Sequence, residues 1–507
     1  MKFASAVKLF VTLLLLISTV VKAQENYVLL NANDTEDEII RKAANVVPTK
    51  RQLHWQQLEL TAFFHFGINT FTGKEWGTGK EDPQLFNPTD LDARQWVRVA
   101  KEAGIKQVIL TAKHHDGFCL WPTKTTKHSV ESSPWKNGKG DVVKEVFNAC
   151  KEYKIGFGIY LSPWDMNAPM YGSEAYNDFF VDQLTELLTQ YGRIDEVWFD
   201  GANGEGPNGK KQVYDFERWY KVIRKLQPSA VIAIMGPDVR WVGTETGYGR
   251  ETEWSVVPAN NLNQNEIATA SQTSIAFKPQ GDMMGDDLGS RDKIRNAKGL
   301  VWYPAETDVS IRPGWFYHEE ENAKVKSPEK LLDIYFNSVG RNGVLLLNIP
   351  PDKRGLVHET DIAVLKKWKQ LRDELFTTNL AKGAVVNSTN GVNTKAIIDS
   401  KYQTYFTTKG NDSTTVITIE LVKQQTFNVL LLQENIAVGQ CIEKFVLDFF
   451  DGKEWKKITE GTTVGYKRLL RFEPVIANKL RLMIQSSRLN PTIAEIGIYK
   501  QASLNKN

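Results

Sequence analysis

The sequence alternates short apolar runs with amphipathic stretches from about residue 58 to residue 376, and this order constrains the fold most. Strands are predicted at 63–68, 107–112, 156–161, 197–199, 231–235, 300–303 and 344–349, with one more near 251–257; helices are predicted at 92–103, 142–153, 176–191, 213–226, 328–338 and 359–376. A repeated strand–helix order requires parallel strands joined by crossover helices. It predicts an α/β fold, a (β/α)8-like, TIM-type barrel. A doubly wound open sheet is the alternative, although no glycine-rich nucleotide loop follows the first strand.

The pattern changes beyond residue 380, where short alternating strands replace the strand–helix repeat. Strands are predicted at 415–421, 428–433, 444–450, 468–472 and 479–484, and Asp451-Gly452 is a typical turn between two of them. Such a series predicts an antiparallel β-sandwich. At 507 residues the chain is also long enough for two domains. We therefore expect a catalytic barrel with an N-terminal lead-in over 24–380, including a short helix at 37–43, and a sandwich over 381–507.

The first 23 residues have the features of a signal peptide. Lys2 and Lys8 precede an apolar run over 9–21, and Ala23 offers a small residue for cleavage. Because that run is too short for a comfortable membrane span, we expect export without membrane insertion, to the periplasm if the source is bacterial and otherwise by secretion. The 63 basic residues include three lysines in this segment, so cleavage leaves 60 of them against 60 acidic residues. A net charge near zero gives no electrostatic basis for binding nucleic acid.

Polar side chains gather at the C-terminal ends of the predicted strands, where α/β barrels build their active sites. They include His65, His114, His115, Tyr160 and Asp200. A catalytic metal is the first hypothesis for such histidines. Adjacent residues of a strand point to opposite faces, however, and no histidine occurs between His128 and His318. The ligand set of a barrel metallohydrolase is therefore incomplete, and we predict no catalytic metal and no required cofactor.

Two carboxylates fit a different chemistry. Asp200 ends the apolar run 197–199, and Glu245 lies on a segment beyond the next predicted strand. Hydrolysis of a glycosidic bond needs one carboxylate as nucleophile or base and another as acid. Glu245, Glu251 and Glu253 compete for the acid role, and the residues alone do not decide among them.

Several motifs resemble those of glycoside hydrolase family 29, the α-L-fucosidases. They are His65-Phe66-Gly67, Glu75-Trp76, the segment 113–118 (Lys-His-His-Asp-Gly-Phe) and the segment 197–201 (Val-Trp-Phe-Asp-Gly), within a similarity that spans about residues 55–350. The resemblance implies a retaining exo-hydrolase in which Asp200 is the nucleophile. It also implies that Trp315 packs against the fucose methyl group, and that the fucose ring and hydroxyls are held by His65, Glu75, Trp76, His114, His115 and Tyr160.

Two further segments resemble known modules. The stretch 240–247 is similar to subgroup B of the family, in which the Glu of a Gly-x-Glu-x-Gly segment is the acid/base; the residue implied here is Glu245, and the implied substrates carry α-1,3- or α-1,4-linked fucose. Residues 396–399, followed by Tyr405-Phe406, resemble discoidin-like and family 32 carbohydrate-binding modules. For this domain we favour a role in bracing the barrel over glycan binding, and a structural Ca²⁺ is compatible with the resemblance.

The sequence therefore predicts an exported, retaining α-L-fucosidase that removes terminal fucose from oligosaccharides or glycoconjugates by double displacement. The alternatives are a glycan-binding protein that has lost catalysis and a barrel hydrolase that acts on another sugar.

Overall fold

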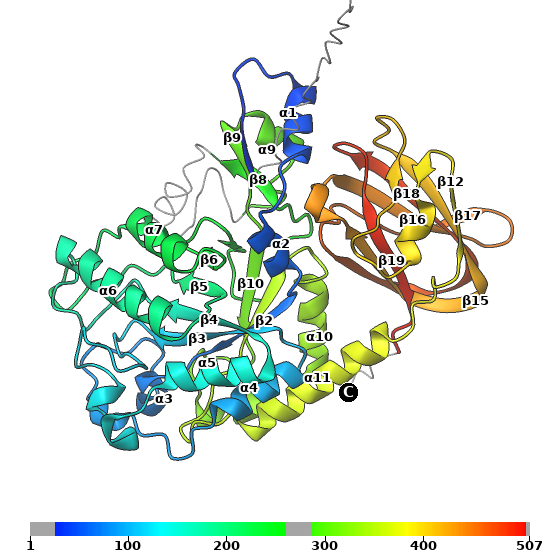
Figure 1. Cartoon of the computed structure of the whole chain (residues 1–507). Coiled ribbons are helices and arrows are strands. Elements are labelled where there is room, and N and C mark those ends of the chain that lie inside the picture. The colour runs from blue at the N-terminus through cyan, green and yellow to red at the C-terminus, as the bar shows by residue number, and fades with distance from the viewer. Residues whose placement is uncertain (1–25, 260–284, 503–507) are drawn as a thin grey trace, which may run out of the picture.

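The barrel expected from the strand–helix order is confirmed. The computed structural model describes residues 26–259 and 285–502. Eight parallel strands form a nearly closed barrel in the order β6-β5-β4-β3-β2-β11-β10-β7 (Figure 1). These strands are β2 (Leu60–Phe64), β3 (Gln107–Lys113), β4 (Gly156–Leu161), β5 (Glu196–Phe199), β6 (Val231–Ile234), β7 (Arg240–Trp241), β10 (Ala305–Ser310) and β11 (Val344–Asn348).

Helices connect the barrel strands and pack around their outer side. They are α3 (Ile68–Thr72), α4 (Ala93–Glu102), α5 (Val142–Tyr153), α6 (Glu174–Gln190), α7 (Phe216–Leu226), α10 (Pro328–Asn337) and α11 (Glu359–Phe376). Free backbone N–H groups in first turns are capped by the side chains of Asp92 (α4), Asp141 (α5), Asp215 (α7) and Ser327 (α10). These caps explain why several helices begin within one or two residues of the predicted positions.

Two strands that were predicted for the barrel lie in a separate sheet. The segments expected at 300–303 and near 251–257 correspond to β9 (Gly299–Trp302) and β8 (Val256–Ala259), which pair antiparallel with each other, and β9 also pairs with β1 (Tyr27–Leu29). The barrel uses β7 and β10 instead. The prediction was wrong because β10 carries acidic residues on the side that faces the barrel interior and therefore lacks the apolar run of a buried parallel strand.

Short helices lie next to the small sheet, in the chain or in space. The lead-in helix expected at 37–43 is α1 (Glu36–Ala44), and α2 (Lys50–Gln56) follows it; α9 (Arg291–Arg295) packs beside α1 and β8. The predicted signal peptide, residues 1–23, lies outside the described residues.

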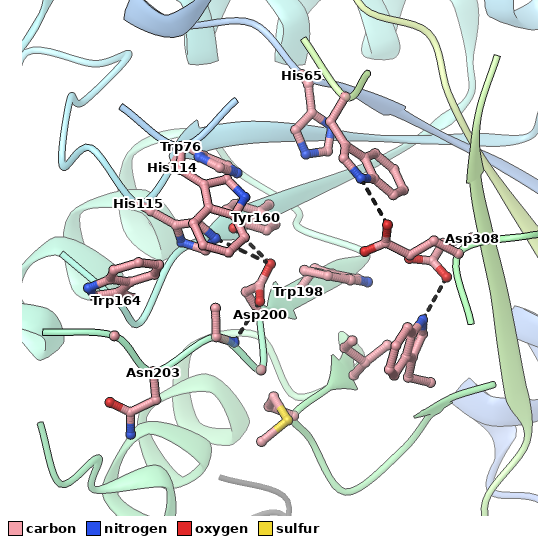
Figure 2. Close-up of a pocket in the computed structure, with 18 of the residues that line it drawn as sticks. His65, Trp76, His114, His115, Tyr160, Trp164, Trp198, Asp200, Asn203 and Asp308 are labelled. Carbon is pink, nitrogen blue, oxygen red and sulfur yellow. Dashed lines mark hydrogen bonds and ion pairs between the residues drawn. The ribbon is translucent and has the colours of Figure 1, made fainter. Parts of the chain in front are cut away.

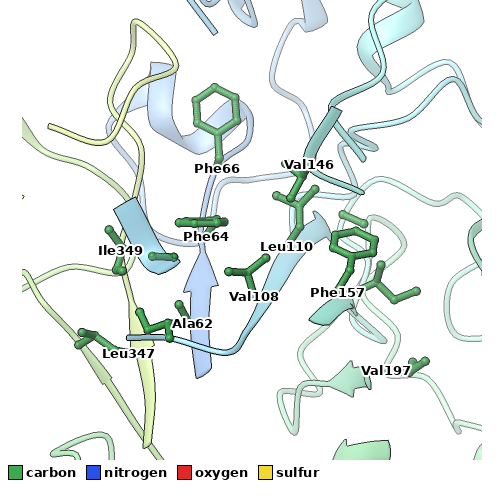
Figure 3. Close-up of a cluster of buried hydrophobic side chains, with 14 of the residues drawn as sticks. Ala62, Phe64, Phe66, Val108, Leu110, Val146, Phe157, Val197, Leu347 and Ile349 are labelled. Carbon is green, nitrogen blue, oxygen red and sulfur yellow. The ribbon is translucent and has the colours of Figure 1, made fainter. Parts of the chain in front are cut away.

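Alternate residues of each barrel strand point to opposite sides. Ala62, Phe64, Val108 and Leu110 point outward into a large apolar cluster shared with the helices, part of which is drawn in Figure 3. The barrel interior is filled by a second cluster that includes Phe63, Ile109, Tyr160, Trp198 and Leu346. Because side chains fill the barrel, space for a ligand remains at the ends of its strands.

The C-terminal region is an antiparallel sheet domain, but its strands are longer than predicted. They are β12 (Val385–Ser388), β13 (Gly391–Val392), β14 (Thr407–Thr408), β15 (Thr415–Glu434), β16 (Ile442–Phe450), β17 (Trp455–Gly461), β18 (Arg468–Ser487) and β19 (Ile493–Tyr499). The predicted strands 415–421 and 428–433 are both part of β15, and 468–472 and 479–484 are both part of β18. Irregularities in the β15–β18 pairing, between Glu420 and Gln425 and between Phe427 and Val429, interrupt the register inside these long strands.

Candidate active site

A cavity of about 730 Å³ opens at the C-terminal ends of the barrel strands (Figure 2). Its lining combines aromatic rings with a small number of titratable groups, as is usual for ligand pockets. The strands and loops of the barrel bring most of the predicted site residues to this one cavity: His65, Trp76, His114, His115, Tyr160, Asp200, Glu245 and Trp315.

Asp200 stands directly after β5, and both of its carboxylate oxygens are held. Its Oδ1 accepts a hydrogen bond from the Ala202 backbone N–H at 2.7 Å, and its Oδ2 accepts one from the Tyr160 hydroxyl at 3.1 Å. His115 Nε2 lies 3.8 Å from the same Oδ2. Tyr160 in turn stacks on Trp198, with ring centroids 5.1 Å apart. A carboxylate held in this way keeps one orientation toward the cavity, which is what attack on a bound substrate requires.

Three histidines form one wall of the cavity and are uncharged at neutral pH. Burial lowers the pKa of His65 to about 3, and burial also lowers the pKa values of His114 and His115. His65 Nδ1 lies 2.9 Å from Asn348 Oδ1, and His115 Nδ1 lies 2.7 Å from Ser162 Oγ. Because Nδ1 is engaged in both rings, each Nε2 is left for another partner, and neutral imidazoles can donate to or accept from sugar hydroxyls.

Glu245 lies on the exposed segment after β7. Its Oε2 accepts a hydrogen bond from Trp315 Nε1 at 3.3 Å. Desolvation by the surrounding cavity raises its pKa, and the negative charges of Asp200 and Glu75 add to this effect. A carboxyl whose pKa is raised holds its proton closer to neutral pH, as a general acid must.

The two competing acids have other partners. The carboxylate of Glu251 pairs with Arg341 and Arg468, and that of Glu253 is buried between Arg240 and Arg250. In the described part of the chain, neither acid is among the residues that line the cavity. This arrangement favours Glu245 over both.

Glu75 is placed differently from the other predicted residues, because it is not among the described residues that line the cavity. Its Oε2 accepts the backbone N–H groups of Trp315 at 2.8 Å and Phe316 at 3.4 Å, and its Oε1 lies 2.6 Å from His318 Nε2. Glu75 therefore holds the segment that carries the Trp315 ring. Its neighbour Trp76 is 58% exposed and stands at the cavity edge, perpendicular to the ring of His115.

Comparison with known proteins identifies the family. A family model described as alpha-L-fucosidase matches residues 30–370. Alpha-L-fucosidase 1 of Arabidopsis thaliana is 45% identical over 465 residues, which cover 89% of this chain and 87% of that protein. The chain belongs to the α-L-fucosidase family. It is accordingly a glycoside hydrolase, as the motifs predicted, and the hypothesis of a glycan-binding protein without catalysis loses its support.

Solved structures of fucosidases share the architecture of this fucosidase. A candidate α-L-fucosidase of Bacteroides ovatus is 52% identical, with a TM-score of 0.85, and the match covers 95% of this chain and 79% of that one. A family 29 fucosidase of Ruminococcus gnavus, solved in complex with fucose, is 33% identical, with a TM-score of 0.80, and the match covers 90% of this chain and 95% of that one. Barrel and C-terminal domain are thus both part of the shared fold.

The cavity of this fucosidase also contains Asp308, which the sequence analysis missed together with β10. Asp308 is 5% exposed, and its Oδ1 accepts a hydrogen bond from Trp241 Nε1 at 2.7 Å. Burial raises its pKa to about 8, and the charge of Glu245 acts in the same direction. The cavity therefore holds a third carboxyl, which keeps its proton at neutral pH. In 305–310 (Ala-Glu-Thr-Asp-Val-Ser) two acids occur with the two-residue period of a strand, and this was the signal that could have revealed it.

Within residues 26–259 and 285–502, no group of three or more His, Cys, Asp or Glu side chains is arranged to hold a metal ion. None of the helices in these residues is long and apolar enough to cross a membrane. That this fucosidase requires no cofactor remains a prediction.

Proposed function

We propose that this fucosidase is an exo-acting, retaining enzyme with Asp200 as nucleophile and Glu245 as acid/base. The observation that carries the proposal is the placement of both carboxyls on one cavity, one held by two hydrogen bonds and the other with a raised pKa. In the first step Asp200 attacks the anomeric carbon while Glu245 protonates the departing oxygen. In the second step Glu245 takes a proton from water, which attacks the anomeric carbon and releases Asp200.

The neutral histidines and the aromatic walls supply recognition of a terminal sugar. His65, His114 and His115 exchange hydrogen bonds with the fucose hydroxyls, and contacts that tighten in the transition state lower the barrier. Trp315 gives an apolar wall for the fucose methyl group. Glu75 acts in this arrangement through the backbone of Trp315 and Phe316, which it holds in place.

For the substrate, we propose α-1,3- and α-1,4-linked fucose on branched glycans, as in subgroup B. The position of Glu245 on the segment 243–247 supports this choice. Residues 201–204 and Lys211 also line the cavity. We assign this part of the lining to the sugars that remain after fucose leaves.

The remaining expectations belong to the same proposal. The N-terminal segment 1–23 directs export, to the periplasm or outside the cell, and the mature enzyme does not insert into a membrane. Catalysis needs side chains alone, without a cofactor. The C-terminal domain is of the discoidin-like type, and a structural Ca²⁺ within it is compatible with the proposal.

Product stereochemistry, followed by NMR during the first turnovers, tests the mechanism. Retention requires that the α-anomer of free fucose is released first, and early appearance of the β-anomer, before mutarotation, would refute double displacement. Asp200→Gly should abolish turnover, and azide, which fits the space left by the carboxylate, should restore it with the formation of fucosyl azide of inverted configuration. Glu245→Gln should lower kcat/KM about 10²–10⁴-fold on substrates with poor leaving groups. Glu205→Gln, at an exposed acid that does not line the cavity, is the matched control.

A further inference from the structure

The segment that carries Glu245 is exposed at its tip and buried on both sides. Thr244, Glu245 and Thr246 are exposed, whereas Gly243 and Gly247 next to them are buried. The Gly247 N–H donates to the backbone oxygen of Asp308 at 3.1 Å, which ties one side of the tip to β10. Among the described residues, the side chain of Glu245 accepts one hydrogen bond, from Trp315 Nε1. Its position therefore depends on how firmly the backbone of this segment is held.

An internal ion pair closes the segment into a loop. Arg240 in β7 pairs with Glu253, and the two side chains are 0% and 1% exposed. Arg250 Nη1 also lies 3.4 Å from the second carboxylate oxygen of Glu253. Residues 240–253, which we call the acid loop, thus start and end at one buried contact, with Glu245 at the exposed tip.

The C-terminal domain holds the closing residue of the acid loop. Thr463 Oγ1 accepts the Glu253 N–H at 3.0 Å, and Gln440 Nε2 donates to the Glu253 backbone oxygen at 3.0 Å. The same Gln440 accepts the Ser255 N–H through Oε1 at 2.8 Å. Side chains of the C-terminal domain therefore form hydrogen bonds with the backbone N–H and the backbone oxygen of Glu253 and with the N–H of Ser255.

A third contact extends this attachment toward the tip. Arg468 Nη1 donates to the backbone oxygen of Glu251 at 2.6 Å, and its guanidinium also pairs with the Glu251 carboxylate. Gln440, Thr463 and Arg468 are each 1% exposed or less. The domain packs along α10 on this side of the barrel (Figure 1), where the Arg471 guanidinium lies 3.6 Å from the ring centre of Phe336. The contacts to the acid loop are thus buried parts of a continuous interface.

We propose that the C-terminal domain positions the proposed acid Glu245 by holding the acid loop. Gln440, Thr463 and Arg468 are the positioning residues. The inference rests on the proposed role of Glu245 and goes beyond it, because it assigns a function to the second domain that needs no bound glycan. A displacement of about 1 Å at a reacting group can lower the rate about 100-fold. Loosening the end of the acid loop should therefore impair proton donation while leaving Asp200 untouched, since Asp200 is held by β4 and by its own turn.

The test compares two substrates in the full-length enzyme. Dinitrophenyl fucoside releases a leaving group that needs no proton, and methyl fucoside releases one that does. In Thr463→Val and in Gln440→Met we expect kcat/KM to fall at least about tenfold on methyl fucoside and less than about threefold on dinitrophenyl fucoside. Thr463→Ser, which keeps the hydroxyl, should restore the wild-type ratio. Thr415→Val is the matched control, because that buried hydroxyl bonds to Asn390 and Ser388 within the C-terminal domain.

Each outcome decides the inference. Equal losses on both substrates, or no loss in a folded Thr463→Val enzyme, would overturn it, and so would the same substrate-dependent loss in Thr415→Val. Glu245→Ala serves as the reference for missing acid catalysis. If that variant shows the substrate dependence and Thr463→Val does not, the positioning role alone fails. If Glu245→Ala shows no substrate dependence, the proposed acid role fails and the inference falls with it.

Discussion

Replacing Asp308 with Asn tests whether burial in the cavity keeps this carboxyl protonated in the folded protein. The side chain is 5% exposed, and its Oδ1 accepts the Trp241 indole N–H at 2.7 Å. An Asn side chain keeps the shape and the acceptor oxygen and cannot ionise. The change therefore removes the titration of Asp308 while it preserves the hydrogen bond to Trp241.

The magnitude follows from the pKa of Asp308, which burial raises from 3.8 to about 8. As the pH rises above 4, the unfolded chain loses this proton first, while the folded protein keeps it up to about pH 8. The free energy of unfolding of the wild type therefore falls by about 1.4 kcal/mol for each pH unit in this window. Between pH 5 and pH 7 the loss amounts to about 3 kcal/mol. Asp308→Asn does not undergo this loss, so its free energy of unfolding relative to wild type should rise by about 3 kcal/mol between pH 5 and pH 7.

Urea unfolding of both proteins at pH 5, 6 and 7, followed by tryptophan fluorescence, measures the difference. Asp292→Asn, at an acid whose side chain is 88% exposed, controls for the loss of one negative charge. A stability difference between Asp308→Asn and wild type that stays constant from pH 5 to pH 7 would refute the reasoning. It would mean that the folded protein ionises Asp308 in the same range as the unfolded chain.

Two further changes test the groups around the proposed catalytic carboxyls. Tyr160→Phe removes the hydrogen bond to Asp200 Oδ2 and keeps the ring. Because a hydrogen bond to a charged group is worth about 1.5–3 kcal/mol, kcat/KM should fall about 10–100-fold. A change below twofold in steady-state kinetics would contradict this. Trp315→Phe removes the indole N–H that stabilises the Glu245 carboxylate. The pKa of Glu245 should then rise further, and because the acid must be protonated, the alkaline limb of the kcat/KM–pH profile should move to higher pH; a shift to lower pH would contradict the assignment.

Much of the barrel was predictable because its signals are local. The bounds of β4, α5 and α11 agree with the prediction to the residue, since apolar periodicity and capping side chains act over a few neighbouring residues. Asp200 was recognisable for a similar reason. A buried apolar run that stops on an acid places that acid at the functional end of a parallel strand.

The failures share one physical cause, which is that the missing information lay in distant neighbours. Strand β10 has a polar sequence although it is buried. Its acids are tolerated there because Glu306 accepts the indole N–H of Trp198 at 2.7 Å and Asp308 accepts that of Trp241. Both partners come from other strands of the barrel. The segment β9, by contrast, is apolar enough for a barrel strand, yet it pairs with β1 and β8. Periodicity reports that a segment is buried and does not report which sheet buries it.

By itself, the sequence determined most of the order of strands and helices, the barrel and the strand-end position of Asp200, and its resemblance to a known family named the sugar. Residue type and spacing alone did not decide among Glu245, Glu251 and Glu253, and only the family resemblance pointed to Glu245. The tertiary structure supplies the physical reason for that choice, because burial and arginine partners from the barrel and the C-terminal domain occupy the other two acids and leave Glu245 facing the cavity. The choice of acid is a property of contacts made across the whole chain, and no local pattern contains those contacts.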